Sequence, residues 1–145
     1  MKKQTLVRIL CALLVCLLTA FLLVSCADVE KTGAWETATY TKNETLGKGA
    51  KTITVKVIAE EQELTFTIKT DKENLEDALL EHELIAGDES AFGLYIKKVN
   101  GIVADYDTDK SYWAITKNGE ATSGAKSTVI SDGECYELTK TISEW

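Results

Sequence analysis

Apolar and polar residues alternate along two neighbouring stretches between residues 51 and 70. The alternating apolar positions are Ile53, Val55 and Val57, followed by Leu64, Phe66 and Ile68. A period of two places every second side chain on the same face of a strand. The pattern therefore predicts two half-buried strands that form a hairpin, although the polar break at Glu60-Glu61 lacks the Asn-Gly or glycine of the commonest tight turns.

The period changes after this hairpin. The next apolar-face positions are Leu75, Ala78, Leu79 and His82, which lie at the i, i+3, i+4 and i+7 spacing of a helix. Thr70 is followed three residues later by Glu73, which is typical of a capping box, and Gly87 supplies a stop. We expect one helix of about three turns across the sheet.

Shorter strand patterns follow, beginning at Gly93, Ser111 and Gly133. Asn100-Gly101 and Asn118-Gly119 predict tight turns, because this dipeptide accommodates the positive φ angles of type I′ turns. The order of strand, strand, helix and several strands predicts an α+β fold. We expect a beta-grasp-like domain over residues 51–145, with one helix packed on a mixed sheet of four to five strands.

The first 25 residues have the pattern of a lipoprotein signal peptide. A basic start precedes an apolar run over 9–24, which is shorter than the about 20 residues of a membrane span. The run ends in the letters LVSC, residues 23–26, which resemble a bacterial lipobox. We therefore expect residues 1–25 to be removed and Cys26 to carry the lipid, so that the protein is anchored at the extracytoplasmic face of the cell membrane.

Residues 26–50 are polar and mixed, and we interpret them as a lipid-anchored tether with an N-terminal extension. A bare tether accounts for the first few residues, but Trp35 and Tyr40 are unusual in a linker. We expect the segment near Trp35 to pack on the edge of the domain.

Charge and cysteine content narrow the range of functions. The full chain has a net charge of −7, and residues 1–25 contain three basic residues and no acidic one, so their removal leaves −10. Such a surface repels phosphate backbones, which excludes nucleic acid as a partner. Cys11 and Cys16 leave with the signal, so Cys135 remains as the unmodified cysteine and no intramolecular disulfide is expected.

Two patterns could supply ligands for a metal or groups for catalysis. Asp105, Asp107 and Asp109 repeat like the start of an EF-hand loop, but Lys110 and Thr116 stand where that loop needs glycine and a bidentate glutamate. We therefore expect a solvated acidic loop and no metal site.

Cys135 with His82 as its base would fit a nucleophilic scheme. The acidic neighbours Glu134 and Glu137 disfavour the thiolate, however, so we expect a half-buried strand residue. No enzyme and no required cofactor are predicted.

Aromatic residues are the remaining candidates for a site. They are Phe92, Tyr95, Tyr106, Tyr112, Trp113 and Tyr136. Most of them should pack in the core or across strands. Tyr112 and Trp113 are adjacent, so within a strand they point to opposite faces. One of the two can therefore meet a ring-shaped ligand or another protein, and the pattern does not say which.

Six short motifs occur in order from residue 74 onward. They are LEDALL at Leu75–Leu80, GLYIKKVNG at 93–101, YW at 112–113, NGE at 118–120, Gly124, and SDGECYEL at 131–138. Each motif alone is a common helix, turn or strand. Together they resemble the transcobalamin-like C-terminal domain, an uncharacterised family frequent on secreted and lipid-anchored Gram-positive proteins.

This resemblance implies a beta-grasp domain that binds a soluble ligand. In the vitamin B12 carriers this domain covers one face of cobalamin, so cobalamin or a related corrinoid is the implied ligand. The implied contacts are Phe92, Gly93, Tyr95, Tyr112, Trp113, Ala121 and Thr122. Those carriers also have a large helical domain for which this chain has no room, so weak binding, or binding shared with a second surface protein, is expected.

The sequence thus predicts a lipid-anchored, extracytoplasmic, non-enzymatic ligand-binding module. The alternative is a surface module for protein–protein interaction or adhesion that takes no small-molecule ligand.

Overall fold

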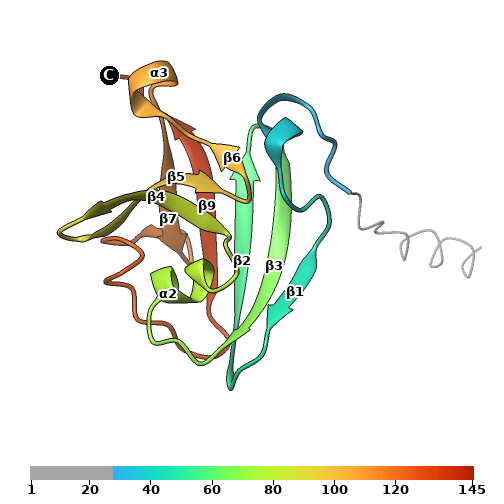
Figure 1. The fold of residues 1–145 in the computed structure, drawn as a ribbon, viewed down its shortest axis with the longest axis vertical. Coiled ribbons are helices and arrows are strands. Elements are labelled where there is room, and N and C mark those ends of the chain that lie inside the picture. Colours follow the sequence, from blue (N-terminus) through green and yellow to red (C-terminus); the bar gives the residue numbers. More distant parts are fainter. Residues whose placement is uncertain (1–27) are drawn as a thin grey trace, which may run out of the picture.

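The computed structural model describes residues 28–145, so the predicted signal peptide and Cys26 lie outside the described residues. Within residues 28–145, no helix is long and apolar enough to cross a membrane. Figure 1 shows the described chain as strands with a few short helices.

Within the described residues, twelve elements make up an α+β fold. In chain order they are η1 (Gly33–Thr37), β1 (Glu44–Gly47), β2 (Lys51–Ala59), β3 (Gln62–Thr70), α2 (Leu75–Leu80), β4 (Ile85–Ser90), β5 (Gly93–Val99), β6 (Ile102–Val103), α3 (Tyr106–Asp109), β7 (Ser111–Lys117), β8 (Glu120–Ala121) and β9 (Cys135–Ile142). One sheet has six strands in the order β1-β3-β2-β9-β7-β8, and the other has three in the order β4-β5-β6.

The predicted β2–β3 hairpin is confirmed. Val55 pairs with Phe66 in antiparallel register, and the odd-numbered residues of β2 from Ile53 onward are buried. The turn needs no glycine because Glu60 itself adopts a left-handed conformation, with a φ of 54°. Both Asn-Gly turns are also confirmed, since they connect β5 to β6 and β7 to β8 with positive φ at each turn residue.

The helix is shorter than predicted and begins differently. Helix α2 covers six residues, and the cap is Asn74, whose side chain accepts a hydrogen bond from the Asp77 N–H at 2.9 Å. The expected capping box at Thr70 and Glu73 is wrong, because Thr70 is the last residue of β3. Leu75, Ala78 and Leu79 are buried as predicted.

Gly87 does not stop the helix. It lies in β4, at a register shift opposite β5. A Cβ at this position would lie 1.9 Å from the Tyr95 carbonyl oxygen. The close approach of two strands therefore requires glycine here. Gly87, which was expected to end the helix, belongs instead to a strand whose last five residues are exposed.

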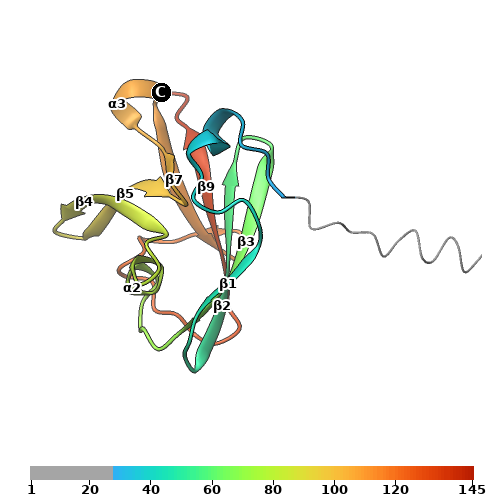
Figure 2. The same cartoon turned by 45° about the vertical axis from the view of Figure 1, so that its right-hand side comes forward.

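The strand count also differs from the prediction of one sheet with four to five strands. Strands β4, β5 and β6 form a separate sheet, which projects from the six-stranded sheet in Figures 1 and 2. Strand β1 adds a parallel edge next to β3. Residues of β4 beyond Ile85 are exposed on both faces, so they lack the alternation that reveals a half-buried strand.

Residues 28–50 pack as part of the same fold. Trp35 is fully buried in the core and not merely packed on the edge, and its Nε1–H donates to the Ala59 carbonyl oxygen at 2.9 Å. Tyr40 contacts Phe66 edge-to-face, with ring centroids 5.5 Å apart. The segment thus covers one end of the main sheet.

Candidate functional site

Strand β7 carries the Tyr112-Trp113 pair at a partly open edge of the main sheet. It pairs with β9 over its whole length but with β8 only at Thr116 and Lys117. Trp113 is 7% exposed and belongs to the core, whereas Tyr112 is 38% exposed. Tyr112 is therefore the outward ring of the pair.

A hollow of about 410 Å³ follows this edge. Five consecutive β7 residues, 112–116, line one side, and residues 121–124 line the other. Because consecutive strand residues point to opposite faces, this lining runs along the strand edge and not over one face. The Thr122 N–H donates to the Ile115 carbonyl oxygen at 3.0 Å and holds the loop against the strand.

A second hollow of about 180 Å³ lies between β5 and β7. It shares Tyr112, Trp113, Ile115 and Gly124 with the first and adds Leu94, Tyr95, Ile96 and Ala125. We call the two hollows together the β7 groove. Tyr95 stands on its rim, about half exposed.

Two buried hydrogen-bonding atoms of groove residues have no partner within residues 28–145. They are Trp113 Nε1 and Thr116 Oγ1. Native folds pair most buried polar groups, because an unpaired one costs about 1–3 kcal/mol. Of the three such atoms in the described part of the chain, two therefore belong to groove residues, and the third, His82 Nε2, lies beside β1.

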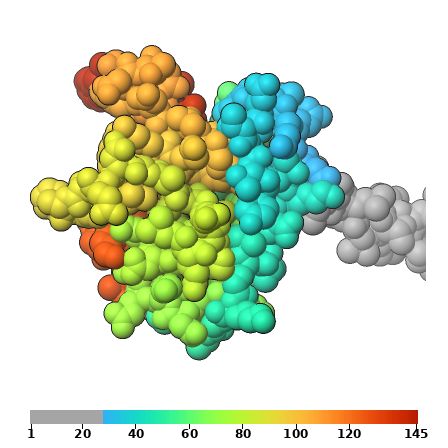
Figure 3. All heavy atoms as spheres, viewed as in Figure 1, coloured from blue at the N-terminus to red at the C-terminus, as the bar shows by residue number. Residues whose placement is uncertain are grey.

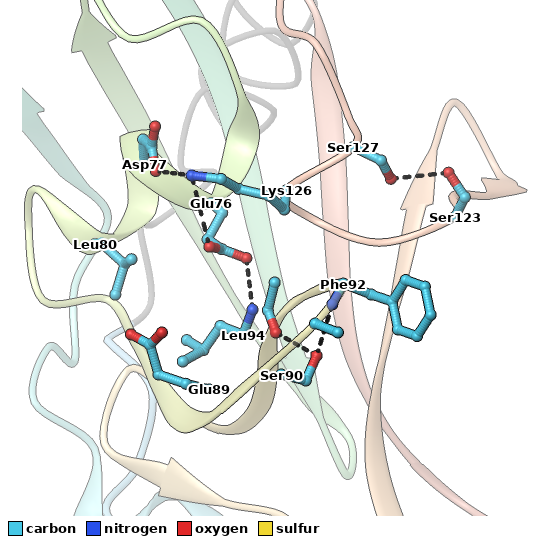
Figure 4. A pocket seen from close by; sticks show the side chains of 12 residues that line it. Glu76, Asp77, Leu80, Glu89, Ser90, Phe92, Leu94, Ser123, Lys126 and Ser127 are labelled. Carbon is cyan, nitrogen blue, oxygen red and sulfur yellow. Dashed lines mark hydrogen bonds and ion pairs between the residues drawn. The ribbon is translucent and has the colours of Figure 1, made fainter.

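A third hollow, the hairpin pocket, lies between α2, the β4–β5 hairpin and residues 123–127 (Figure 4). Its volume is about 810 Å³. Glu76 Oε2 accepts a hydrogen bond from the Leu94 N–H at 2.8 Å, which ties α2 to the hairpin. Leu94 and Ser123 line both this pocket and the β7 groove, so the hollows adjoin.

The ion pair in the hairpin pocket is made by Lys126. Its Nζ lies 2.8 Å from Asp77 Oδ1 and 3.9 Å from Glu76 Oε1. Hydrogen bonds from Lys126 and, to a smaller extent, from Asn74 lower the pKa of the Asp77 carboxyl. The hydrogen bond between Lys126 and Asp77 also raises the pKa of Lys126. The single positive charge of Lys126 thus lies against two carboxylates, with the closer contact to Asp77.

The resemblance-derived residues divide between these hollows. Phe92 and Gly93 line the hairpin pocket, while Tyr95, Tyr112, Trp113, Ala121 and Thr122 line the β7 groove. Gly93 has a φ of +107°, and a Cβ there would lie 2.6 Å from Lys126 Cβ. Phe92 is 93% exposed, and in Figure 4 its ring points away from Glu76 and Lys126.

Sequence reasoning missed Glu76 and Lys126. Glu76 stands in the first turn of α2 and is buried, although glutamate at that position is usually a solvated partner of the helix dipole. Lys126 lies in a loop without any periodic pattern. No local signal could have identified their contact, because 50 residues separate them along the chain.

Asp105 and Asp109 of the acidic loop accept hydrogen bonds from neighbouring residues of the loop. Asp105 caps α3 and accepts from the Asp107 N–H at 3.0 Å and from Thr108 Oγ1 at 3.0 Å. Asp109 accepts from the N–H and hydroxyl of Ser111. Among residues 28–145, no group of three or more His, Cys, Asp or Glu side chains could hold a metal ion.

Cys135 and His82 lie far apart. Cys135 is an exposed residue of β9, not the expected half-buried one. His82 Nε2 lies against Gly47 of β1, where a Cβ would be 2.6 Å away. Strands β1 and β9 are separated by β3 and β2, which is about 14 Å across a sheet.

A partly buried polar network centred on Glu134 lies at the end of the main sheet near the groove. Glu134 accepts from Lys117 Nζ at 2.5 Å, from the Ser131 N–H at 2.8 Å and from the Tyr136 hydroxyl. Burial raises the pKa of Glu134, but the hydrogen bonds from Lys117, Tyr136 and Ser131 outweigh it and lower the pKa to about 2. Burial and the Glu134 carboxylate raise the pKa of Tyr136.

The chain matches no protein-family model and no curated protein. Among solved structures it is similar to a protein of Ruminococcus gnavus ATCC 29149 named a "putative metal binding protein". The identity is 36% and the TM-score 0.62, over 65% of this chain and 99% of that one.

The chain is also similar to haptocorrin in complex with cobinamide. The identity is 21% and the TM-score 0.52, over 67% of this chain and 26% of that one. This second likeness concerns the fold alone, and it lends distant support to a transcobalamin-like fold. With 36% identity over nearly all of its length, the first likeness shows that the chain belongs to the same family as the Ruminococcus gnavus protein.

Proposed function

We propose that this protein is a lipid-anchored, extracytoplasmic, non-enzymatic module that binds a ligand in the β7 groove. One observation carries the proposal. The seven resemblance-derived residues, which come from separate parts of the chain, line adjoining hollows. Exposed Tyr112 and Tyr95 supply flat apolar surface there, as sites for ring-shaped ligands require.

A corrinoid is the candidate ligand, bound by a transcobalamin-like, beta-grasp domain. The haptocorrin likeness supports this choice, because that protein was crystallised with cobinamide. The chain spans only 26% of haptocorrin. Pocket-bound small molecules bury about 70–90% of their surface, and shallow hollows of one small domain leave much of a corrinoid uncovered. The complex is therefore weak, or is completed by a second surface protein.

A metal is not part of the proposal. The name of the Ruminococcus gnavus relative suggests one, but the residues of the described chain do not fit it. His82 stands without two further ligands, and Asp105 and Asp109 of the acidic loop bond to their own neighbours. A Cys135–His82 catalytic pair is likewise unsupported, given the distance between their strands.

Titration tests the corrinoid proposal directly. The full chain in detergent micelles is titrated with dicyanocobinamide while the corrinoid absorption and the tryptophan fluorescence are recorded. We expect saturable changes that Tyr112→Ala weakens by about tenfold or more. Tyr106→Ala is the matched control, because Tyr106 is 39% exposed but lies on α3, outside the groove. No change up to about millimolar ligand refutes corrinoid binding.

The exposed hairpin favours the second candidate function. Phe92 is almost fully exposed at the tip of the β4–β5 hairpin, which projects from the body of the molecule (Figure 3). An exposed aromatic on a projecting hairpin suits a protein-interaction or adhesion module. If dicyanocobinamide does not bind, and Phe92→Ala abolishes attachment of the protein to a surface partner, this second function replaces the first.

A further inference from the structure

The β7 groove has an uncharged lining in a strongly charged protein. Charged residues make up 27% of the chain, yet none of them lines either hollow of the groove. The polar side-chain groups of the lining residues are the Trp113 indole N–H and the hydroxyls of Tyr95, Tyr112, Thr116, Thr122 and Ser123. A hydroxyl both donates and accepts hydrogen bonds, so these groups fit a ligand that does the same without carrying a charge.

The lysines next to the groove are already neutralised. Each lysine that directly follows a groove residue in the chain is in an ion pair. The pairs are Lys117 with Glu134 at 2.5 Å, Lys126 with Asp77 at 2.8 Å, and Lys97 with Asp88 at 2.6 Å. A carboxylate that entered the groove would lose hydration without meeting a free cation. The net negative charge of the protein adds repulsion.

A ligand cation finds no partner in the groove either. No carboxylate belongs to the lining, and Glu120 lies beyond it, exposed on β8. The groove therefore disfavours ligand groups of either charge and favours ligand groups that are polar and neutral. Trp113 Nε1 and Thr116 Oγ1, the two unpaired atoms of groove residues, are neutral groups as well.

We propose that the β7 groove selects uncharged ligands, for which a primary carboxamide is the matching group, and rejects the corresponding carboxylates. A carboxamide presents N–H donors and a carbonyl acceptor in one plane, which suits hydroxyl groups and the open backbone edge of β7. This inference rests on the proposed function, because it requires that the groove bind a ligand. It does not require that the ligand be a corrinoid.

The first test uses small probes that differ only in this group. Nicotinamide and nicotinate are titrated into the ¹⁵N-labelled full chain in detergent micelles at pH 7. The Trp113 indole resonance is assigned with Trp113→Phe and followed by NMR. We expect nicotinamide to shift this resonance and nicotinate to act at about tenfold or more higher concentration. Equal effects of the two probes, or no effect of nicotinamide, would overturn the proposal.

A charge-inserting variant tests the cause of the selectivity. Thr122→Lys places a cation in the groove and keeps the Thr122 backbone bond to Ile115. We expect it to improve nicotinate binding by about tenfold. Thr45→Lys is the control with the same change of charge, on the exposed edge strand β1 at the other side of the sheet. Improvement by both variants, or by neither, contradicts the proposal.

A corrinoid pair separates this inference from the proposed function. Dicyanocobinamide carries carboxamides where dicyanocobyrinic acid carries carboxylates. Binding of both with equal affinity would support corrinoid binding and refute the selectivity. Discrimination between nicotinamide and nicotinate without any corrinoid binding would refute the corrinoid ligand and support the selectivity.

Discussion

At the scale of single residues, the Tyr112-Trp113 pair shows what alternation can and cannot predict. Adjacent strand residues must point to opposite faces, and the structure agrees. Which of the two faces inward depends on the pairing of β7 with β9, where Trp113 lies opposite Lys140. That register is a long-range property, so it was not available from the local pattern. The unpaired Trp113 Nε1 and the Lys126 ion pairs were hidden for the same reason.

Glu134 makes the stability of the fold depend on pH. Its folded-state pKa of about 2 is lower than the ordinary value of 4.5, so its charged form stabilises the fold above pH about 4.5. This contribution is lost as the pH falls towards 2. Glu134→Gln should lower the free energy of unfolding at pH 7 by about 1.5–3 kcal/mol. It should also flatten the decline of stability below pH about 4.5.

Urea unfolding measured between pH 2 and 7 checks this prediction. Glu137→Gln is the control, because it is the same substitution three residues further along the chain, on strand β9. An unchanged pH profile in Glu134→Gln would mean that the network with Lys117 and Tyr136 does not contribute as described.

At the scale of elements, hydrophobic periodicity predicted the half-buried strands and helix, and it failed for a strand that is exposed on both faces. The β2–β3 hairpin and the buried face of α2 follow from their alternation and helical spacing. Strand β4 was not predicted, because its last five residues are exposed. The cap of α2 lies at Asn74, four residues after the predicted cap at Thr70. Both residue types are good caps, and only the tertiary structure places Thr70 in β3.

The two caps can be distinguished by mutation. Asn74→Ala removes the hydrogen bond from the Asp77 N–H and should cost about 0.5–2 kcal/mol of stability. Glu73→Ala, which tests the capping box expected from the sequence, should change stability by less than about 0.5 kcal/mol. Thermal denaturation followed by circular dichroism measures both, and a larger loss in Glu73→Ala would favour the capping box.

The N-terminal segment should be as important for stability as a core element. Trp35→Ala removes a fully buried indole together with its hydrogen bond to Ala59. We expect a loss of about 3–5 kcal/mol in the free energy of unfolding. Trp145→Ala is the same substitution at a residue that is 99% exposed, and it should have little effect. Similar losses in chemical denaturation of the two variants would show that residues 28–50 do not pack as described.

At the scale of the whole molecule, the class of fold was predictable and its sheet arrangement was not. The order of elements indicates an α+β domain, and the structure has that class. The division into sheets of six and three strands depends on β5 pairing with β4 and not with β7. Strand patterns report burial on one face, and they carry no information about which strand is the neighbour.

The anchoring of the whole molecule is tested at Cys26. Cys26→Ala removes the thiol that the proposed lipid anchor requires, and that anchor would supply the membrane affinity of the protein. We expect incorporation of labelled palmitate to be lost in this variant. Cys135→Ala should leave the incorporation unchanged, because Cys135 lies within the folded domain. Palmitate incorporation that survives Cys26→Ala would contradict the anchor.

The folded domain begins only a few residues after Cys26, and this short spacing would determine the orientation of an anchored molecule at the membrane. Val29 is buried and its N–H donates to the Thr41 carbonyl oxygen. Three residues after Cys26 can reach at most about 10 Å. The domain would thus be held close to the bilayer by the side at which Val29 enters. In Figure 1 the described chain enters on one side, and the β4–β5 hairpin projects from the opposite side. The hairpin would face away from the lipid, towards ligands and proteins in the surrounding medium.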